Sequence, residues 1–256
     1  LGLGCAYFGG DKSSDEETIA GTRRAIELGI DYVDTSPLYG ESERRIGLAL
    51  ADGWRDRVYL QTKTGTHPTR RGDYSAAVTR WSVENSLKLL GTDYLDSVLI
   101  HDPEDIEVPL AKDHALEELL RLKEQGIVRH VGLGVRDHAF HRRAMATGHI
   151  DILLTYLDYT LIAQSAAQGV FPDARRHGVN GSRGRERGLL GREMPVEFVG
   201  HGGPSLVGVA CDPEATPSVP APAPESPPMD MSSPKDVSKA LADTVVIALV
   251  DKLKAE

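Results

Sequence analysis

The feature that most constrains the fold of this chain is a strand–helix unit that repeats six times between residues 1 and 178. Each unit consists of a short apolar run, then an amphipathic helical pattern, then a glycine that closes the helix. Successive runs start roughly 25–35 residues apart, which is the length of one strand–helix crossover. The runs lack strict alternation, as is typical of parallel strands that are buried on both faces. We expect strands at residues 1–7, 30–34, 58–64, 94–101, 128–135 and 150–159.

The helical patterns between these strands have recognisable ends and apolar faces. Ser14, with Glu17 three residues later, forms a capping box that opens the first helix. The faces expected to be buried comprise Ile19, Ala25, Ile26 and Leu28 in the first helix, Val78, Trp81, Leu87 and Leu90 in the third, and Leu116, Leu119, Leu120 and Leu122 in the fourth. These units predict an α/β fold with a parallel sheet, either doubly wound or closed. Tyr7 stands where a first-turn G-x-G-x-x-G fingerprint needs glycine, which favours a closed barrel.

After residue 178 the repeat stops. Residues 196–199 and 206–211 read as short strands, but the gap between them is too short for a crossover helix, so they fit a hairpin. Residues 212–235 are rich in Pro, Ala and Ser, which indicates a flexible segment. Helix-like spacing returns in residues 236–254. We therefore expect a barrel over residues 1–192, an irregular Pro-rich segment over 193–235 and a C-terminal helix over 236–256.

Charge and cysteine content exclude several classes of protein. The net charge of −9 disfavours nucleic acid and anionic membranes as partners. Cys5 and Cys211 are far apart and suggest neither a disulfide framework nor a metal site. The longest apolar run near the C-terminus, residues 244–250, is too short to span a bilayer, and no secretory leader opens the chain. His138 and His141 are expected on a solvated, basic helix face, so we predict no metal. These observations favour a cytoplasmic protein with a small-molecule substrate.

Four chemically useful side chains fall at or just after the ends of consecutive predicted strands. Asp34 ends the second strand, Lys63 the third and His101 the fourth, and Tyr39 lies in the loop after Asp34. Each residue alone has an ordinary structural explanation, such as a strand-end cap or a surface ring. Barrel enzymes place their chemistry at the carboxyl ends of neighbouring strands, so we expect all four side chains to meet at one rim.

Together these groups suit the proton transfer that accompanies hydride transfer to a carbonyl oxygen. A free tyrosine has a pKa of about 10 and is a poor acid or base at neutral pH. A neighbouring ammonium group, Lys63, is expected to lower the pKa of Tyr39 and make it a general acid/base. Asp34 would compensate the cost of burying Lys63. His101 would hydrogen-bond the substrate oxygen.

At these residues the sequence resembles the aldo-keto reductase family. The matching segments are residues 34–43, 61–63, 86–96, 99–102 and 126–132, and the resemblance covers about residues 1–192. It implies a (β/α)8 TIM barrel that binds NAD or NADP, with the last two βα units truncated or irregular. It also implies that Asp34, Tyr39, Lys63 and His101 are the catalytic tetrad. Residues 101–103 and 159–165 are similar to the branch that oxidises aldoses such as L-fucose or L-galactose at the first carbon.

The resemblance further implies a set of cofactor contacts. They are Gly4, Cys5, Asp34, Gln164, Ser182, Gly188 and Leu189. The chain departs from the family at Gly134-Val135, where many members have Ser-Asn, and it lacks a recognisable eighth strand with its cofactor loop. We therefore predict an NAD(P)-dependent oxidoreductase that acts on an aldose or a small aldehyde or alcohol. The alternative is a catalytically impaired barrel that serves as a nucleotide-binding regulatory subunit, or an inactive fragment.

Overall fold

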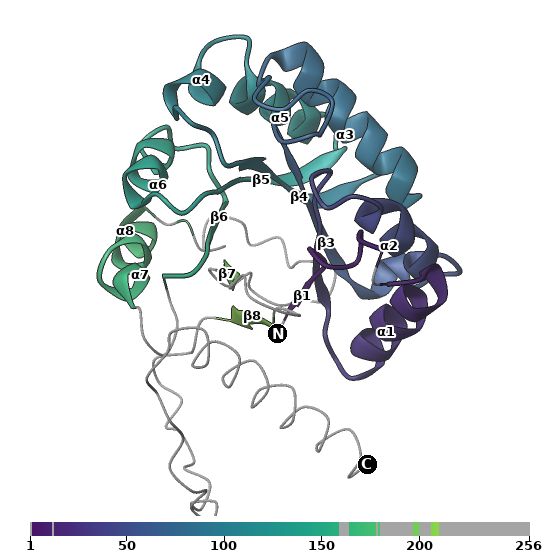
Figure 1. Cartoon of the computed structure of the whole chain (residues 1–256). Coiled ribbons are helices and arrows are strands. Elements are labelled where there is room, and N and C mark those ends of the chain that lie inside the picture. The colour runs from purple at the N-terminus through teal and green to yellow at the C-terminus, as the bar shows by residue number, and fades with distance from the viewer. Residues whose placement is uncertain are drawn as a thin grey trace, which may run out of the picture. The chain divides into compact units, whose positions relative to one another are not determined.

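The structure is a computed structural model that describes residues 2–11, 13–158, 164–177 and 179, together with the backbone of residues 197–199 and 206–209. All of them belong to one compact unit, residues 1–210. Within these residues, eight strands form a closed barrel in sequence order (Figure 1). The strands are β1 (Gly2–Gly4), β2 (Tyr32–Asp34), β3 (Tyr59–Thr64), β4 (Leu95–His101), β5 (Val128–Gly134), β6 (Ile152–Thr155), β7 (Glu197–Val199) and β8 (Leu206–Val209).

The first six strands confirm the predicted strand–helix repeat, and each lies inside its predicted range. All adjacent pairs from β1 to β6 are parallel. Figure 1 shows the helices wrapped around the outside of these strands. They are α1 (Asp15–Glu27), α2 (Ser42–Leu50), α3 (Ala76–Leu90), α4 (Glu107–Leu110), α5 (Ala115–Glu124), α6 (His138–Met145), α7 (Ser165–Gln168) and α8 (Val170–His177), with a 3-10 turn at Arg55–Arg57.

The sequence signals for the helices are confirmed except on the buried face of α1. Of the faces predicted to be buried, α3 buries Val78 and Leu90, and α5 buries Leu116, Leu119 and Leu122. Ser14 and Glu17 form the predicted capping box, with hydrogen bonds of 2.9 and 3.1 Å. The predicted buried face of α1 is largely wrong, because the helix buries Thr18, Thr22 and Ile26. These residues are four positions apart and therefore share one face of a helix. Leu28 lies beyond the last turn and is 43% exposed.

The last two strands form the predicted hairpin. Both strands also belong to the barrel and close it between β6 and β1, which we did not expect, because we placed the barrel in residues 1–192. β7 is parallel to β6, whereas β8 is antiparallel both to β7 and to β1. The described residues thus contain one hairpin in place of the last two strand–helix units. The remainder of the predicted Pro-rich segment, and the helix expected at residues 236–256, lie outside the described residues.

Alternation along the strands divides the barrel into two environments. Val33, Leu60, Val98 and similar residues pack with the helices in the main hydrophobic core. The residues between them face the barrel interior, where Leu99, Ile152 and Leu154 form a separate apolar cluster. This alternation also directs Asp34, Lys63 and His101 inward. The polar strand-end residues therefore meet inside the rim rather than against the helices.

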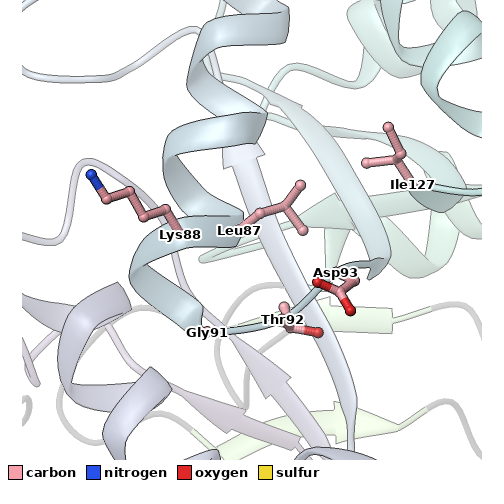
Figure 2. A pocket seen from close by; sticks show the side chains of 6 residues that line it. All are labelled: Leu87, Lys88, Gly91, Thr92, Asp93 and Ile127. Atoms are coloured by element: carbon pink, nitrogen blue, oxygen red, sulfur yellow. The ribbon is translucent and has the colours of Figure 1, made fainter.

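A surface hollow of about 450 Å³ (Figure 2) lies at the end of the barrel opposite the rim that carries Asp34, Lys63 and His101. It is lined by Leu87, Lys88, Gly91, Thr92, Asp93 and Ile127. Thr92 and Asp93 precede β4, whereas His101 ends that strand. The hollow is therefore separate from the rim that carries the predicted site.

Candidate active site

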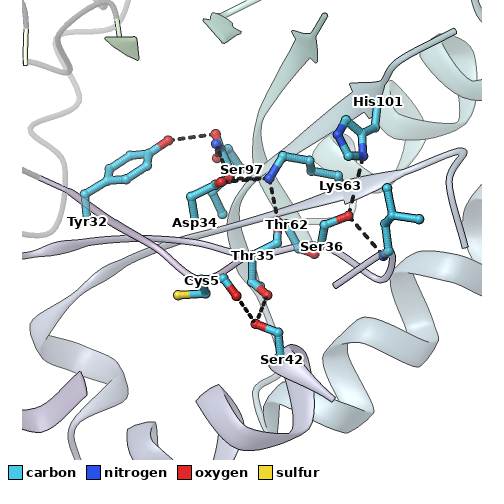
Figure 3. Close-up of polar contacts among 12 residues, drawn as sticks. Cys5, Tyr32, Asp34, Thr35, Ser36, Ser42, Thr62, Lys63, Ser97 and His101 are labelled. Carbon is cyan, nitrogen blue, oxygen red and sulfur yellow. Dashed lines mark hydrogen bonds and ion pairs between the residues drawn. The ribbon is translucent and has the colours of Figure 1, made fainter. Parts of the chain in front are cut away.

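Asp34 and Lys63 form a buried ion pair at the ends of β2 and β3 (Figure 3). The Lys63 Nζ atom donates to the two Asp34 carboxylate oxygens at 2.7 and 2.8 Å, and to the Thr35 carbonyl oxygen at 2.8 Å. Each of the two residues is 1% exposed. Burial alone would lower the pKa of Lys63, but the charge of Asp34 and the proximity of Tyr39 outweigh it and raise the pKa above its ordinary value. Lys63 is therefore charged at neutral pH although it lies inside the barrel.

Gln61 fixes the other side of the Asp34 carboxylate, a contact that our sequence analysis did not predict. Its Nε2 atom donates to Asp34 Oδ1 at 2.8 Å. Its Oε1 atom accepts from the Tyr32 hydroxyl and the Ser97 hydroxyl, each at 2.7 Å. Because a carboxylate can only accept hydrogen bonds, the amide nitrogen must face Asp34, and this determines the amide orientation. The sequence feature that could have predicted this contact is that Gln61 is polar and lies two positions before Lys63, hence on the same face of β3.

Tyr39 lies next to Lys63, as predicted, but the pKa of Tyr39 is shifted in the direction opposite to our expectation. The Lys63 Nζ atom is 4.8 Å from the centre of the Tyr39 ring. Burial raises the pKa of Tyr39, and the charge of Lys63 lowers it by less, so that the net pKa lies above 10.0. The predicted net lowering of the pKa is wrong because the ring is more desolvated than a loop position suggests. In this state Tyr39 keeps its proton at neutral pH.

The loop that carries Tyr39 packs directly on the loop that follows β1. A Cβ atom placed on Gly9 would lie 1.5 Å from the Tyr39 carbonyl oxygen, so only glycine fits there. The Glu41 backbone N–H donates to the Gly9 carbonyl at 3.2 Å. Arg45, on α2, donates to the carbonyl of Gly10 at 2.9 Å. These contacts fix the position of the Tyr39 backbone relative to the loop that follows β1.

His101 is held at the end of β4 with one ring nitrogen hydrogen-bonded within the protein. Its Nδ1 atom lies 2.7 Å from the Thr66 hydroxyl, and the Ser36 hydroxyl is 3.5 Å away. The Tyr74 hydroxyl donates to the His101 carbonyl at 2.7 Å. The His101 ring meets the Tyr39 ring edge to face, with 6.3 Å between centroids. The structure thus brings Asp34, Lys63, Tyr39 and His101 together at one rim.

The predicted cofactor residues are only partly described. Gly4 ends β1, and the backbone N–H of Cys5 donates to the Asp34 carbonyl at 2.9 Å, so both lie beside the ion pair. Burial and the charge of Asp34 raise the pKa of the Cys5 thiol, which stays protonated. Gln164 is exposed at the start of α7. Ser182, Gly188 and Leu189 lie outside the described residues.

The environment predicted for the α6 histidines is wrong. His141 is fully buried, and its Nε2 atom donates to the Val135 carbonyl at 2.8 Å. His138 pairs with the buried Asp158 at 2.5 Å. Among the described residues, no group of three potential metal ligands is found. The described helices also include none with the length and apolar content needed to cross a membrane.

Comparison with known proteins identifies the family. The profile of the Aldo/keto reductase family matches residues 1–181. The chain belongs to the aldo/keto reductase family. Among curated relatives, a D-threo-aldose 1-dehydrogenase of a Pseudomonas species is 30% identical over 224 residues, covering 76% of this chain and 68% of the relative. A D-arabinose 1-dehydrogenase of Saccharomyces cerevisiae is 38% identical over 113 residues, covering 43% of this chain and 33% of the relative.

Solved structures of aldo-keto reductases share this fold. A Pseudomonas aeruginosa protein assigned to these reductases is 33% identical with a TM-score of 0.62, covering 69% of each chain. An aldo-keto reductase from Klebsiella pneumoniae in complex with NADPH is 27% identical with a TM-score of 0.59. That alignment covers 69% of this chain and 60% of the Klebsiella chain.

The chemistry of the site fits the nicotinamide cofactor that aldo/keto reductases use. Tyr39 and His101 can supply a proton or a hydrogen bond to an oxygen, and Lys63 can supply charge, but none of these side chains can carry a hydride. A site made of these groups therefore performs oxidoreduction only together with a hydride carrier. In this family that carrier is NAD or NADP.

Proposed function

We propose that this protein is an NAD(P)-dependent dehydrogenase that oxidises an aldose at its first carbon, with Tyr39 as the general acid/base. The observation that carries the proposal is the contact of Tyr39 with the buried Asp34–Lys63 ion pair, beside His101. The aldose class is supported by the two relatives that are named aldose dehydrogenases. The same site would reduce a small aldehyde in the opposite direction.

Each side chain has a definite task in this mechanism. Tyr39 holds a proton at its hydroxyl group and donates it to the oxygen of a carbonyl that is being reduced. In the oxidative direction Tyr39 must first lose its proton before it can act as the base. Burial opposes this loss, and the neighbouring Lys63 ammonium favours it by stabilising the phenolate. Asp34 keeps Lys63 charged and in place. His101, whose Nδ1 atom is bound to Thr66, can donate from Nε2 to the substrate oxygen.

A nicotinamide, when bound, would provide the hydride chemistry that these side chains cannot. We expect Gly4, Cys5, Asp34 and Gln164 to contribute to its binding from the described rim. Gly4 and Cys5 would do so mainly through the backbone, since the Cys5 side chain is fully buried.

Turnover and cofactor binding by a Tyr39→Phe variant test the proposal. We expect the variant to lose about 10²–10⁴-fold in kcat with L-galactose, L-fucose or D-arabinose, because the proton donor is removed. NAD(P)H affinity, measured by fluorescence titration, should remain nearly unchanged. Tyr94→Phe is the matched control, because Tyr94 precedes β4 at the opposite rim.

Two results would argue against the proposal. If Tyr39→Phe kept its full rate, the proton-transfer role would be wrong. If the unaltered protein bound NAD(P)H but turned over no aldose or small aldehyde, a nucleotide-binding regulatory role would fit better.

A further inference from the structure

Asp102, which directly follows the last residue of β4, stands beside the proposed reacting groups. Its backbone N–H donates to the Gly134 carbonyl at 2.9 Å. Its φ angle of 41° lies in the left-handed region, which is uncommon for a residue with a side chain. The side chain is 37% exposed, whereas that of His101 is 5% exposed. The carboxylate is therefore held on the accessible side of the His101 ring.

Two neighbours define where the carboxylate lies. Asp102 Oδ2 is 3.5 Å from His101 Nε2, the ring nitrogen that is expected to face the substrate. Asp102 Oδ1 accepts a hydrogen bond of 3.3 Å from the hydroxyl of Tyr156, which follows β6. The charge of Asp102 also contributes to the raised pKa of Tyr39, after burial as the main cause. The carboxylate is thus close to both groups that would contact the reacting oxygen.

The distance between His101 and Asp102 suits a substrate with oxygens on adjacent carbons. A separation of 3.5 Å is too long for a strong hydrogen bond between the two side chains. It places a donor, His101 Nε2, next to an acceptor, Asp102 Oδ2. The first can donate to the oxygen on the reacting carbon, and the second can accept from a hydroxyl on the next carbon. An ionised carboxylate has about four acceptor positions, so it can accept from more than one hydroxyl group at the same time.

We propose that Asp102 is a specificity-determining residue that accepts a hydrogen bond from the 2-hydroxyl of the sugar. This inference rests on the proposed aldose dehydrogenase function and identifies which part of the aldose is recognised. It predicts that the enzyme discriminates an aldose from its 2-deoxy form. A hydrogen bond to a charged acceptor makes such discrimination worth about 10- to 100-fold in kcat/KM.

The test compares kcat/KM for D-arabinose with that for 2-deoxy-D-ribose, which is D-arabinose without its 2-hydroxyl. L-galactose and 2-deoxy-L-galactose form a second pair. In the unaltered protein we expect kcat/KM for the sugar to exceed that for its 2-deoxy form by about 10- to 100-fold. In Asp102→Gly the two values should differ by no more than about threefold, because the acceptor is removed. Glycine adopts the φ angle of this position without strain. Asp102→Asn keeps an uncharged acceptor oxygen and the shape of the side chain, so its ratio should be intermediate.

Asp52 provides the matched control. It also has a left-handed backbone, with φ of 59°, but its side chain is 83% exposed and pairs with Arg23. It follows α2 and lies between that helix and β3, away from the catalytic rim. Asp52→Gly and Asp52→Asn should keep the substrate ratio of the unaltered protein.

The outcomes separate the two proposals. If the unaltered protein is active on both members of each pair without discrimination, or if Asp102→Gly keeps the full ratio, the role of Asp102 is wrong while the dehydrogenase assignment stands. If the unaltered protein oxidises none of these sugars, the aldose assignment fails and the role of Asp102 fails with it.

Discussion

Replacing Lys63 by methionine is the most direct test of how the buried ion pair supports the fold. The substituted side chain would have nearly the length of the original but no charge. Among the described residues, it would leave the Asp34 carboxylate, 1% exposed, with Gln61 as its remaining side-chain donor. Breaking a buried ion pair from one side costs about 3–5 kcal/mol. Domains are stable by about 5–15 kcal/mol, so Lys63→Met should remove a large part of the free energy of unfolding.

Urea denaturation at pH 7, followed by circular dichroism, measures this loss. The double variant Asp34→Asn, Lys63→Met removes both charges, so we expect it to recover a large part of the stability that Lys63→Met loses. Arg44→Met is the control, because it breaks an ion pair that is partly exposed to solvent. The Arg44 and Asp15 side chains are 38% and 36% exposed. Its effect should be far smaller than that of Lys63→Met. A loss below about 1 kcal/mol for Lys63→Met, or losses that simply add in the double variant, would refute the reasoning.

Three further changes probe the surroundings of the site. Gln61→Leu should destabilise the protein by about 2–4 kcal/mol in urea denaturation, because it leaves buried hydroxyl groups without their acceptor; a neutral effect would contradict this. Gly9→Ala should cost about 1–3 kcal/mol and lower kcat by displacing Tyr39, whereas Gly10→Ala, with no atom within 4 Å of its Cβ position, should do neither; equal effects would contradict the packing argument. Burial lowers the pKa of His141 from 6.5 to about 4, so the neutral ring stabilises the fold above pH 6.5, and up to about 3 kcal/mol should be lost as the pH falls toward 4. His141→Gln should reduce the loss of stability between pH 6.5 and pH 4, measured by urea denaturation at each pH. If the variant loses as much stability as the unaltered protein, other groups cause the pH dependence.

The sequence was sufficient to predict the features that depend on local pattern. Apolar runs identified six strands, and their spacing identified the crossovers. The positions of Asp34, Lys63 and His101 at strand ends were enough to predict that they meet, because neighbouring parallel strands end at one rim. The capping box at Ser14 is equally local.

Features that depend on tertiary environment were missed or mispredicted. The role of Gln61 requires the register that sets it beside Ser97 and brings Tyr32 within reach. The direction of the Tyr39 pKa shift depends on how deeply the ring is desolvated, which a loop sequence does not show. His141 reads as a surface residue in a basic helix, yet the helix turns it into the core. In each case the missing information is what packs against the residue.

The direction of β8 has a consequence for how a dinucleotide could be anchored. β1 to β7 run the same way, so β7 ends at the catalytic rim, while the antiparallel β8 starts there and runs to the opposite end. Only residues 200–205 separate the two strands in the sequence, too few for a crossover helix with a phosphate-binding amino terminus. The connection between β7 and β8 therefore cannot offer the amino terminus of a crossover helix to the pyrophosphate of a bound cofactor.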